Sequence, residues 1–272
     1  MKTPLTLILS VAVSLAAYSQ QSKAAADPKK ELCKVWKLSS STQAGQTYQA
    51  GTTDQGIQFT FNADHTFSSS GTPGGDTKGV WIHNPTDKSL FLYAYTGNPD
   101  IPDAPYASTP LALTIESLST ENISLSIKNA TGDGIVNTFT AVSAKVKTPT
   151  INHQRCTDQI KGTWKIASAR IPDQEDHSIL TERMPDETEA QERLTFKPDY
   201  TCTWKTISAG GEINEETYLW NYDSEKAVII IVRIDKGSVE RLLTNVVCEP
   251  GKLVFHEDII HGTGIFTMIP EK

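Results

Sequence analysis

The chain repeats itself once, at the scale of a whole domain. Trp36 near its start is matched by Trp164, and similar residues then follow in the same order in both copies. The remaining matches pair Leu32 with Ile160, Phe59 with Leu194, Phe61 with Phe196, Asp64 with Asp199, Phe67 with Cys202, Trp81 with Trp220, Leu113 with Leu243, Leu118 with Cys248, Leu125 with Phe255 and Phe139 with Phe266. A repeat of this length is a domain rather than a solenoid unit, so the two halves should share one fold.

Runs with an apolar residue at every second position dominate both copies. Ile57, Phe59 and Phe61 show the pattern in the first copy, and Leu253 with Phe255 shows it in the second. A period of two indicates half-buried strands, and turn residues divide eight such strands in each copy. Closing a chain of hairpins removes exposed sheet edges. We therefore predict an all-β chain of two consecutive eight-stranded up-and-down barrels, with an immunoglobulin-like sandwich as the second choice.

The first residues have the pattern of an export signal. Lys2 precedes a mostly apolar stretch from Leu5 to Ala17, which is too short to span a bilayer, and small residues follow before a cleavage point. We expect an exported protein, periplasmic or extracellular, with no membrane span. The predicted domains are a signal peptide at 1–19, a first barrel at 20–146, a linker at 147–155 and a second barrel at 156–272.

The net charge of the chain is negative. It has 25 Lys and Arg against 32 Asp and Glu, a formal charge of −7 at pH 7. Phosphate backbones and anionic membranes repel such a surface, so we expect no nucleic-acid partner.

Four cysteines in an exported chain leave three disulfide pairings open. Cys202 and Cys248 stand where the first copy has larger apolar residues, which favours buried free thiols. The alternative is a disulfide between Cys33 and Cys156, which each precede the first strand of a copy and would clip the two domains together.

Two short motifs resemble a known family. Gly162 and Trp164, at the start of a first strand that leads into a meander, resemble the glycine-x-tryptophan opening of lipocalins. The pattern of Phe61, Asp64 and Phe67 is similar to that of lipocalin-like domains exported by Bacteroidetes bacteria. The resemblance covers both halves, although the first copy lacks the glycine. It implies a calyx that holds a small apolar ligand.

A barrel of eight strands is only just wide enough to fill itself with side chains or to hold one small molecule. The volume of the inward-facing side chains decides whether the barrel is filled or holds a ligand. The second copy has the smaller Cys202 and Cys248 at inward positions, which favours a hollow there. The candidate ligand-binding residues, which can equally pack a core, are Phe61, Phe67, Trp81, Phe196, Cys202, Trp204 and Trp220.

Two further segments are candidates for contact with another domain or protein. The run from Val228 to Val232 is apolar at every position, so both of its faces should be covered, and the first domain is the expected cover. Tyr93, Tyr95 and Tyr106 flank the proline-rich loop from Gly97 to Pro110. A tyrosine-lined loop of this kind suits a lid or a protein-contact site.

Catalytic and metal-binding patterns are missing from the sequence. No serine lies in a nucleophile elbow, and no glycine-rich loop suits a phosphate. His256 and His261 are one residue too far apart for a zinc-protease helix. Asp64 and Asp199 recur in equivalent turns, where aspartate caps the bend, and His65 is expected to be a solvated turn residue. We expect no catalytic residue, no metal and no cofactor.

These observations leave two functions open. The first is an exported, non-enzymatic binding protein that holds a small hydrophobic ligand in a barrel. The second is a structural or protein-interaction module of the cell envelope, in which the barrels are filled and the surface contacts an envelope protein. Both rest on the fold rather than on a site, and an enzyme is the least favoured class because no nucleophile, base and orienting group occur together.

Overall fold

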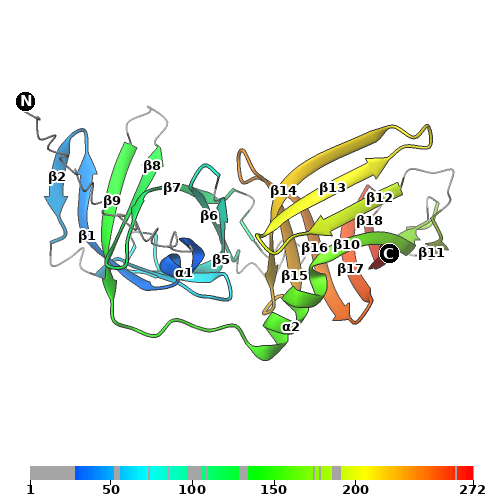
Figure 1. Cartoon of the computed structure of the whole chain (residues 1–272), viewed down its shortest axis with the longest axis horizontal. Coiled ribbons are helices and arrows are strands. Elements are labelled where there is room, and N and C mark those ends of the chain that lie inside the picture. The colour runs from blue at the N-terminus through cyan, green and yellow to red at the C-terminus, as the bar shows by residue number, and fades with distance from the viewer. Residues whose placement is uncertain are drawn as a thin grey trace, which may run out of the picture.

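The computed structural model describes residues 28–271, except for 52–55, 73, 85, 97–105, 108, 129–133, 174, 178, 186–190 and 261. Two closed barrels lie side by side and are joined by an extended segment and a helix (Figure 1). The predicted signal peptide lies outside the described residues. Within the described part of the chain, no helix is long and apolar enough to cross a membrane.

The first barrel is a meander in which every strand is antiparallel to its neighbours. Strand β9 pairs with β1 and so closes the sheet. The elements are α1 (Pro28–Leu32), β1 (Val35–Gln43), β2 (Gln46–Gln49), β3 (Gln58–Phe61), β4 (Thr66–Ser70), β5 (Thr77–Asn84), β6 (Ser89–Ala94), β7 (Leu111–Leu118), β8 (Asn122–Lys128) and β9 (Gly134–Val142).

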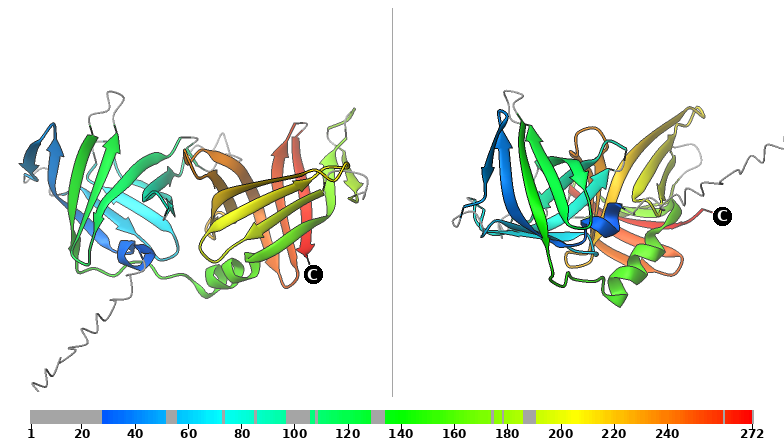
Figure 2. Two further views of the ribbon diagram at one scale, coloured as in Figure 1. Left: turned by 45° about the horizontal axis from the view of Figure 1, so that its top comes forward. Right: turned by 60° about the vertical axis from the view of Figure 1, so that its left-hand side comes forward.

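The second barrel repeats this order, and β18 closes it onto β10. Figure 2 shows the two barrels from two further directions. The elements are α2 (Ile151–Ile160), β10 (Gly162–Pro172), β11 (Leu180–Arg183), β12 (Gln191–Phe196), β13 (Thr201–Ile207), β14 (Ile213–Asp223), β15 (Val228–Arg233), β16 (Val239–Glu249), β17 (Lys252–Ile259) and β18 (Gly262–Pro270).

The predicted fold is therefore confirmed, and the closed sheets exclude the sandwich. Sequence patterns missed strands β2 and β11 and helices α1 and α2. Strands β2 and β11 are extra strands that pair only with the far ends of β1 and β10, and most of their residues are exposed, so they carry no apolar alternation. Helix α2 begins inside the stretch predicted as linker. Its N-cap is Thr150, whose hydroxyl accepts a hydrogen bond from the backbone N–H of His153 at 3.1 Å.

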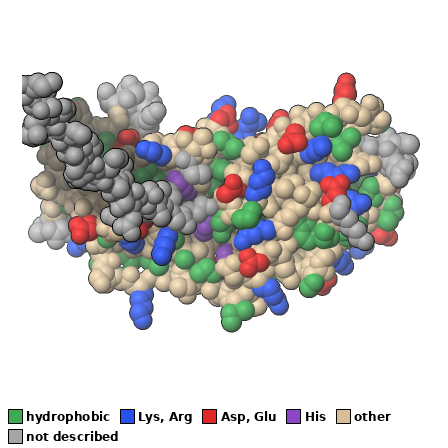
Figure 3. Space-filling view, in the orientation of Figure 1, with side chains coloured by type: hydrophobic (Ala, Val, Ile, Leu, Met, Phe, Trp, Pro, Cys, Tyr) green, Lys and Arg blue, Asp and Glu red, His purple; other side chains and the backbone are tan. Residues whose placement is uncertain are grey.

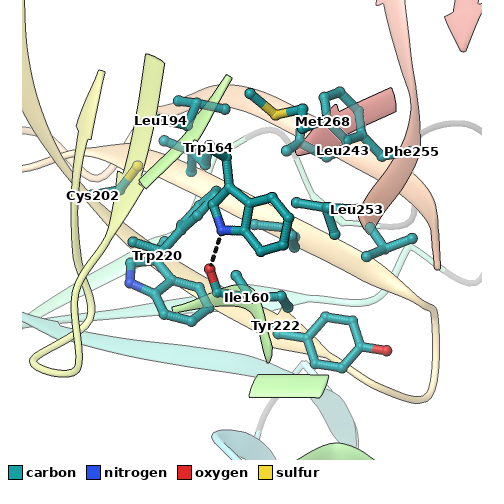
Figure 4. Close-up of a cluster of buried hydrophobic side chains, with 14 of the residues drawn as sticks. Ile160, Trp164, Leu194, Cys202, Trp220, Tyr222, Leu243, Leu253, Phe255 and Met268 are labelled. Atoms are coloured by element: carbon teal, nitrogen blue, oxygen red, sulfur yellow. Dashed lines mark hydrogen bonds between the residues drawn. The ribbon is translucent and has the colours of Figure 1, made fainter. Parts of the chain in front are cut away.

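One end of each barrel is closed by the same device. The indole Nε1 of Trp36 donates to the carbonyl of Leu32 at 2.9 Å, and that of Trp164 donates to the carbonyl of Ile160 at 2.6 Å. All four residues are buried. Figure 4 shows the second copy of this plug, with Trp220 beside it. The helix before each first strand thus ends inside the barrel, where the tryptophan satisfies a helix-end carbonyl.

Strand pairing corrects one of the matches between the copies. Phe139 pairs with Leu38 and Ile123, and in the second barrel the residue in that place is Met268, not Phe266. The residue equivalent to Phe266 is Asn137. A slip by two residues preserves the inward face, so alternation alone does not detect it.

The run from Val228 to Val232 is covered on both faces, as expected. Ile229 and Ile231 point into the second barrel, whereas Val228, Ile230 and Val232 pack against the first. All five residues are at most 2% exposed. The side chains that meet them from the first barrel are Val80, Ile82, Phe91, Tyr93 and Tyr106. The junction is thus a third hydrophobic core, built from the outer faces of β5, β6, β14 and β15.

Equivalent hairpins make this junction, and they meet reciprocally. Asn84 at one end of β5 donates to the carbonyl of Ile234 at 3.5 Å, and Tyr95 after β6 donates to Asp223 at 2.8 Å. Asn84 occupies the position in the first copy that Asp223 occupies in the second, and Tyr95 corresponds in the same way to Ile234. A contact in which each side uses the same pair of positions is the mark of a twofold arrangement.

A stack of four rings runs through the middle of the junction. His65 lies between Trp81 and Tyr200, with ring centroids 4.3 and 4.2 Å away, and Tyr200 stacks in turn on Trp220 at 5.3 Å. His65 is only 6% exposed, so the expectation of a solvated turn residue is wrong. The reason is that its turn, which does cap through Asp64 as predicted, faces the equivalent turn of the other barrel.

Candidate functional site

The wall of the second barrel opens where β10 leaves β12. The first part of β10, Gly162–Lys165, pairs with β12, but the later part, Ala169–Pro172, pairs with β11. A β-bulge between Ile166 and Ser168 marks the change in its pairing with β18. Beyond the pair of Lys165 and Arg193, strands β10 and β12 therefore no longer pair with each other.

A crevice of about 700 Å³ occupies this opening. Its volume falls within the usual range of small-molecule sites. Much of its lining is apolar: Ile166, Ala167, Ala169, Ile171, Met184, Pro185, Phe266 and Ile269. Inward residues such as Ile166 and Phe266 share the lining with outward ones such as Lys165, so the crevice runs from the outer surface into the barrel wall.

Basic groups surround the apolar lining. Lys165 and Arg183 both line the crevice, and among the described residues neither has an ion-pair partner. Arg193 is held by Glu271 at 2.5 Å and by the amide oxygen of Gln191 at 2.9 Å. Figure 3 shows hydrophobic, basic and acidic side chains side by side on the surface of the second barrel. The crevice thus combines an apolar wall with two cations that are unpaired within the part of the chain that the structure describes.

A charged cluster lies inside the barrel next to the crevice. The Arg241 guanidinium makes two hydrogen bonds to the Glu257 carboxylate and one, at 3.2 Å, to Glu192, which also lines the crevice. The guanidinium carbon lies 4.1 Å from the centre of the Trp204 ring. Burial disfavours the charge of Arg241, but Glu257 and Glu192 outweigh it and raise the pKa of the guanidinium.

The cluster fills a gap between two strands. Strands β16 and β17 pair only as far as Thr244 and His256, and beyond this point they separate. Arg241 and Glu257 bridge the gap, beside a small cavity of about 110 Å³. The side-chain ion pair replaces the backbone hydrogen bonds that hold the wall together below it.

The first barrel has an apolar set at the same three positions. Leu111, Ile127 and Ile57 correspond to Arg241, Glu257 and Glu192 by strand pairing. Sequence reasoning missed the cluster, although the repeat carried the signal: three positions that are apolar in one copy are charged in the other.

The seven predicted ligand-binding residues lie in the packed cores or next to the charged cluster. Phe61, Phe67 and Trp81 belong to the first core, and Phe196, Cys202 and Trp220 to the second; all six are at most 4% exposed. Trp204 packs against the second core beneath Arg241. None of the seven lines the crevice. Burial raises the pKa of the Cys202 thiol to about 12, so it packs as a neutral group.

The three predicted contact tyrosines meet the other barrel of the same chain. Tyr93 donates to the carbonyl of Gly237, and Tyr95 and Tyr106 each donate to the same oxygen of Asp223 at 2.8 Å. Gly237 has a positive φ of 64°, and a Cβ there would collide with the Phe91 ring. Residues 97–105 of the proline-rich loop lie outside the described residues.

Ionisation of these tyrosines should weaken the junction at alkaline pH. Burial, with the Asp223 charge added for Tyr95 and Tyr106, raises the pKa of all three far above its ordinary value of 10.0. The unfolded chain releases these protons near pH 10 but the folded chain retains them, so stability is full below about pH 10 and falls above it. Each tyrosine should contribute a slope of up to about 1.4 kcal/mol per pH unit.

Urea unfolding between about pH 8 and pH 11 measures this slope. We expect Tyr106→Phe to flatten it, whereas Tyr48→Phe, at a residue that is 58% exposed, should leave it unchanged. Equal slopes in the wild type and Tyr106→Phe would contradict the assignment.

The histidines and cysteines form no metal-binding cluster in the described part of the chain. No group of three or more His, Cys, Asp or Glu side chains there could hold a metal ion, and His261 of the zinc-like pattern lies outside it. All four cysteines are thiols, and Cys33 packs against the first core while Cys156 packs against the second.

No family model and no curated protein match the chain. Among solved structures, a lipocalin-like protein from Bacteroides uniformis aligns over 41% of this chain and 99% of its own, with 13% identity and a TM-score of 0.30. A mutant of the vaccine antigen Transferrin Binding Protein B from Haemophilus parasuis aligns over 88% of this chain and 76% of its own, with 8% identity and a TM-score of 0.23. The function is therefore inferred from the geometry of the chain itself.

Proposed function

We propose that this chain is an exported, non-enzymatic binding protein that takes up a small molecule in the crevice between β10, β11 and β12 of the second barrel. The crevice carries this proposal, because it joins a volume of ligand size to an apolar wall and to two cations that have no ion-pair partner among the described residues. The ligand site thus lies in the side of the barrel, above the packed core, and not in the middle of the calyx.

The lining indicates the chemistry of the ligand. Ile166, Ile171 and Phe266 offer an apolar surface to an aliphatic or aromatic body. Lys165 and Arg183 offer positive charge at the rim, where a carboxylate or sulfonate stays partly hydrated and pairs with them. We therefore propose an amphipathic anion, such as a fatty acid, as the ligand class.

Binding of a fluorescent fatty acid tests the proposal. We expect cis-parinaric acid to bind the wild-type protein, and Ala169→Trp to weaken it at least about tenfold by filling the crevice. The matched control is Ser41→Trp, because Ser41 holds the position of Ala169 in the first barrel. If both variants bind as the wild type does, the crevice is not the site.

The charge preference has its own comparison. Loss of Lys165 and Arg183 together should weaken the acid, but should leave its methyl ester almost unaffected, because only the acid pairs with them. An equal loss for both compounds would show that the cations act through the shape of the crevice alone.

Exposed apolar residues favour a second candidate function, an interaction module of the cell envelope. Ile179, Met184, Ile213 and Ile260 are between 54% and 94% exposed, and all four lie near the end of the second barrel remote from α2. Apolar side chains gathered at one rim suit contact with another protein. Substitution of Ile179, Ile213 and Ile260 by serine should then abolish capture of the envelope partner without changing the affinity for parinaric acid, because none of these three residues lines the crevice.

A further inference from the structure

Helix α2 places a cysteine against the second barrel. The helix packs across β16 and β14, with His153, Thr157 and Ile160 on its buried face. Cys156 is half-buried next to this face and packs against the second core. The position of Cys156 is therefore set by the same contacts that hold the helix in place.

A second cysteine lies opposite the first. Cys248 near the end of β16 is also half-buried and packs against the same core, and it pairs across the sheet with Leu253. Helix α2 contacts β16, and burial together with the neighbouring Cys156 thiol raises the pKa of both Cys248 and the Tyr222 hydroxyl. Both cysteines are thiols in the structure.

We propose that Cys156 and Cys248 are a redox pair that closes to a disulfide and staples α2 to β16. The thiolate of one cysteine attacks a low-molecular-weight disulfide such as oxidised glutathione, and one glutathione leaves. The second cysteine then attacks the mixed disulfide, and the other glutathione leaves. Two thiols lose two hydrogens, and one glutathione disulfide becomes two glutathione thiols.

The other two cysteines do not compete for this bond. Cys202 is fully buried, and Cys33 packs against the core of the first barrel. The structure therefore favours a single disulfide, between Cys156 and Cys248, over any bond to Cys33 or Cys202. Burial and the neighbouring thiol raise the pKa of Cys248, so exchange should proceed faster at about pH 9 than at about pH 7.

The staple would hold the start of the second repeat. The bond closes a loop of about 90 residues that contains most of the second barrel, and such a loop stabilises a fold chiefly by restricting the unfolded chain. It also fixes α2, the helix through which the two barrels are connected. We expect the oxidised protein to melt about 10 °C above the reduced one.

Non-reducing peptide mapping of the whole protein after incubation with oxidised glutathione is the direct test. A linked peptide pair that contains Cys156 and Cys248 is expected in the wild type and in Cys202→Ser, and in neither Cys156→Ser nor Cys248→Ser. A link through Cys33 or Cys202, or two thiols that stay open to alkylation, overturns the proposal. Melting provides the second readout: the rise in Tm should disappear in Cys156→Ser, and a linked protein with an unchanged Tm overturns the stapling role.

Discussion

Arg241→Ala should destabilise the second barrel by about 3–5 kcal/mol. The substitution leaves the Glu257 carboxylate, whose residue is 9% exposed, without the partner that makes two hydrogen bonds to it. It also removes the cation from the face of Trp204 and the bridge between β16 and β17. Urea unfolding, followed by far-ultraviolet circular dichroism, measures the loss.

Two controls separate the buried cluster from ordinary charge effects. Arg233→Ala breaks an exposed ion pair with Asp235 and should cost less than about 1 kcal/mol. The triple variant Glu192→Ile, Arg241→Leu and Glu257→Ile gives the second barrel the residues of the first. It should be close to the wild type or more stable, because none of the three charges of the cluster then remains. If Arg241→Ala costs no more than Arg233→Ala, the cluster does not hold the wall.

Asp223→Ala should uncouple the two barrels and cost about 3 kcal/mol. Asp223 is 1% exposed and accepts four hydrogen bonds, from the hydroxyls of Tyr95 and Tyr106 and from the backbone N–H groups of Glu225 and Lys226. Alanine removes the acceptor of two phenols of the first barrel, the buried Tyr106 and the half-buried Tyr95. Chemical unfolding should then change from one transition to two.

The matched control is Asp199→Ala, at a turn aspartate that is exposed. Its carboxylate accepts the Thr201 N–H at 2.9 Å within its own turn. Its loss should cost about 1 kcal/mol or less and leave a single transition. A single transition in Asp223→Ala as well would show that the hydrophobic part of the junction couples the barrels without this carboxylate.

Much of the fold could be read from the sequence because the repeat and the alternation report the same inward face. Trp36 and Trp164 marked the first strands correctly, and Val228 to Val232 announced a covered strand. Both predictions depend on the spacing of apolar residues along the chain. In these barrels most consecutive strands are neighbours in the sheet, so this spacing was enough to predict the fold.

The candidate site was less predictable, for a physical reason. The crevice depends on where β10 changes partner from β12 to β11. Strand β11 has no alternating apolar pattern, so the sequence did not predict this strand. The prediction that His65 is solvated was wrong for a similar reason. A turn that faces solvent and a turn that faces another domain can have the same local sequence pattern. Long-range contacts of this kind leave no local periodicity.

The reciprocal junction has an evolutionary consequence. In a dimer of identical subunits, every substitution at such a contact appears on both sides at once, so complementary changes are hard to reach. When the two units lie in one polypeptide, a substitution on one side of the contact does not appear on the other side. Asn84 and Asp223 hold the same position, as do His65 and Tyr200, yet each pair has diverged. A tandem chain can therefore carry different residues on the two sides of a twofold contact.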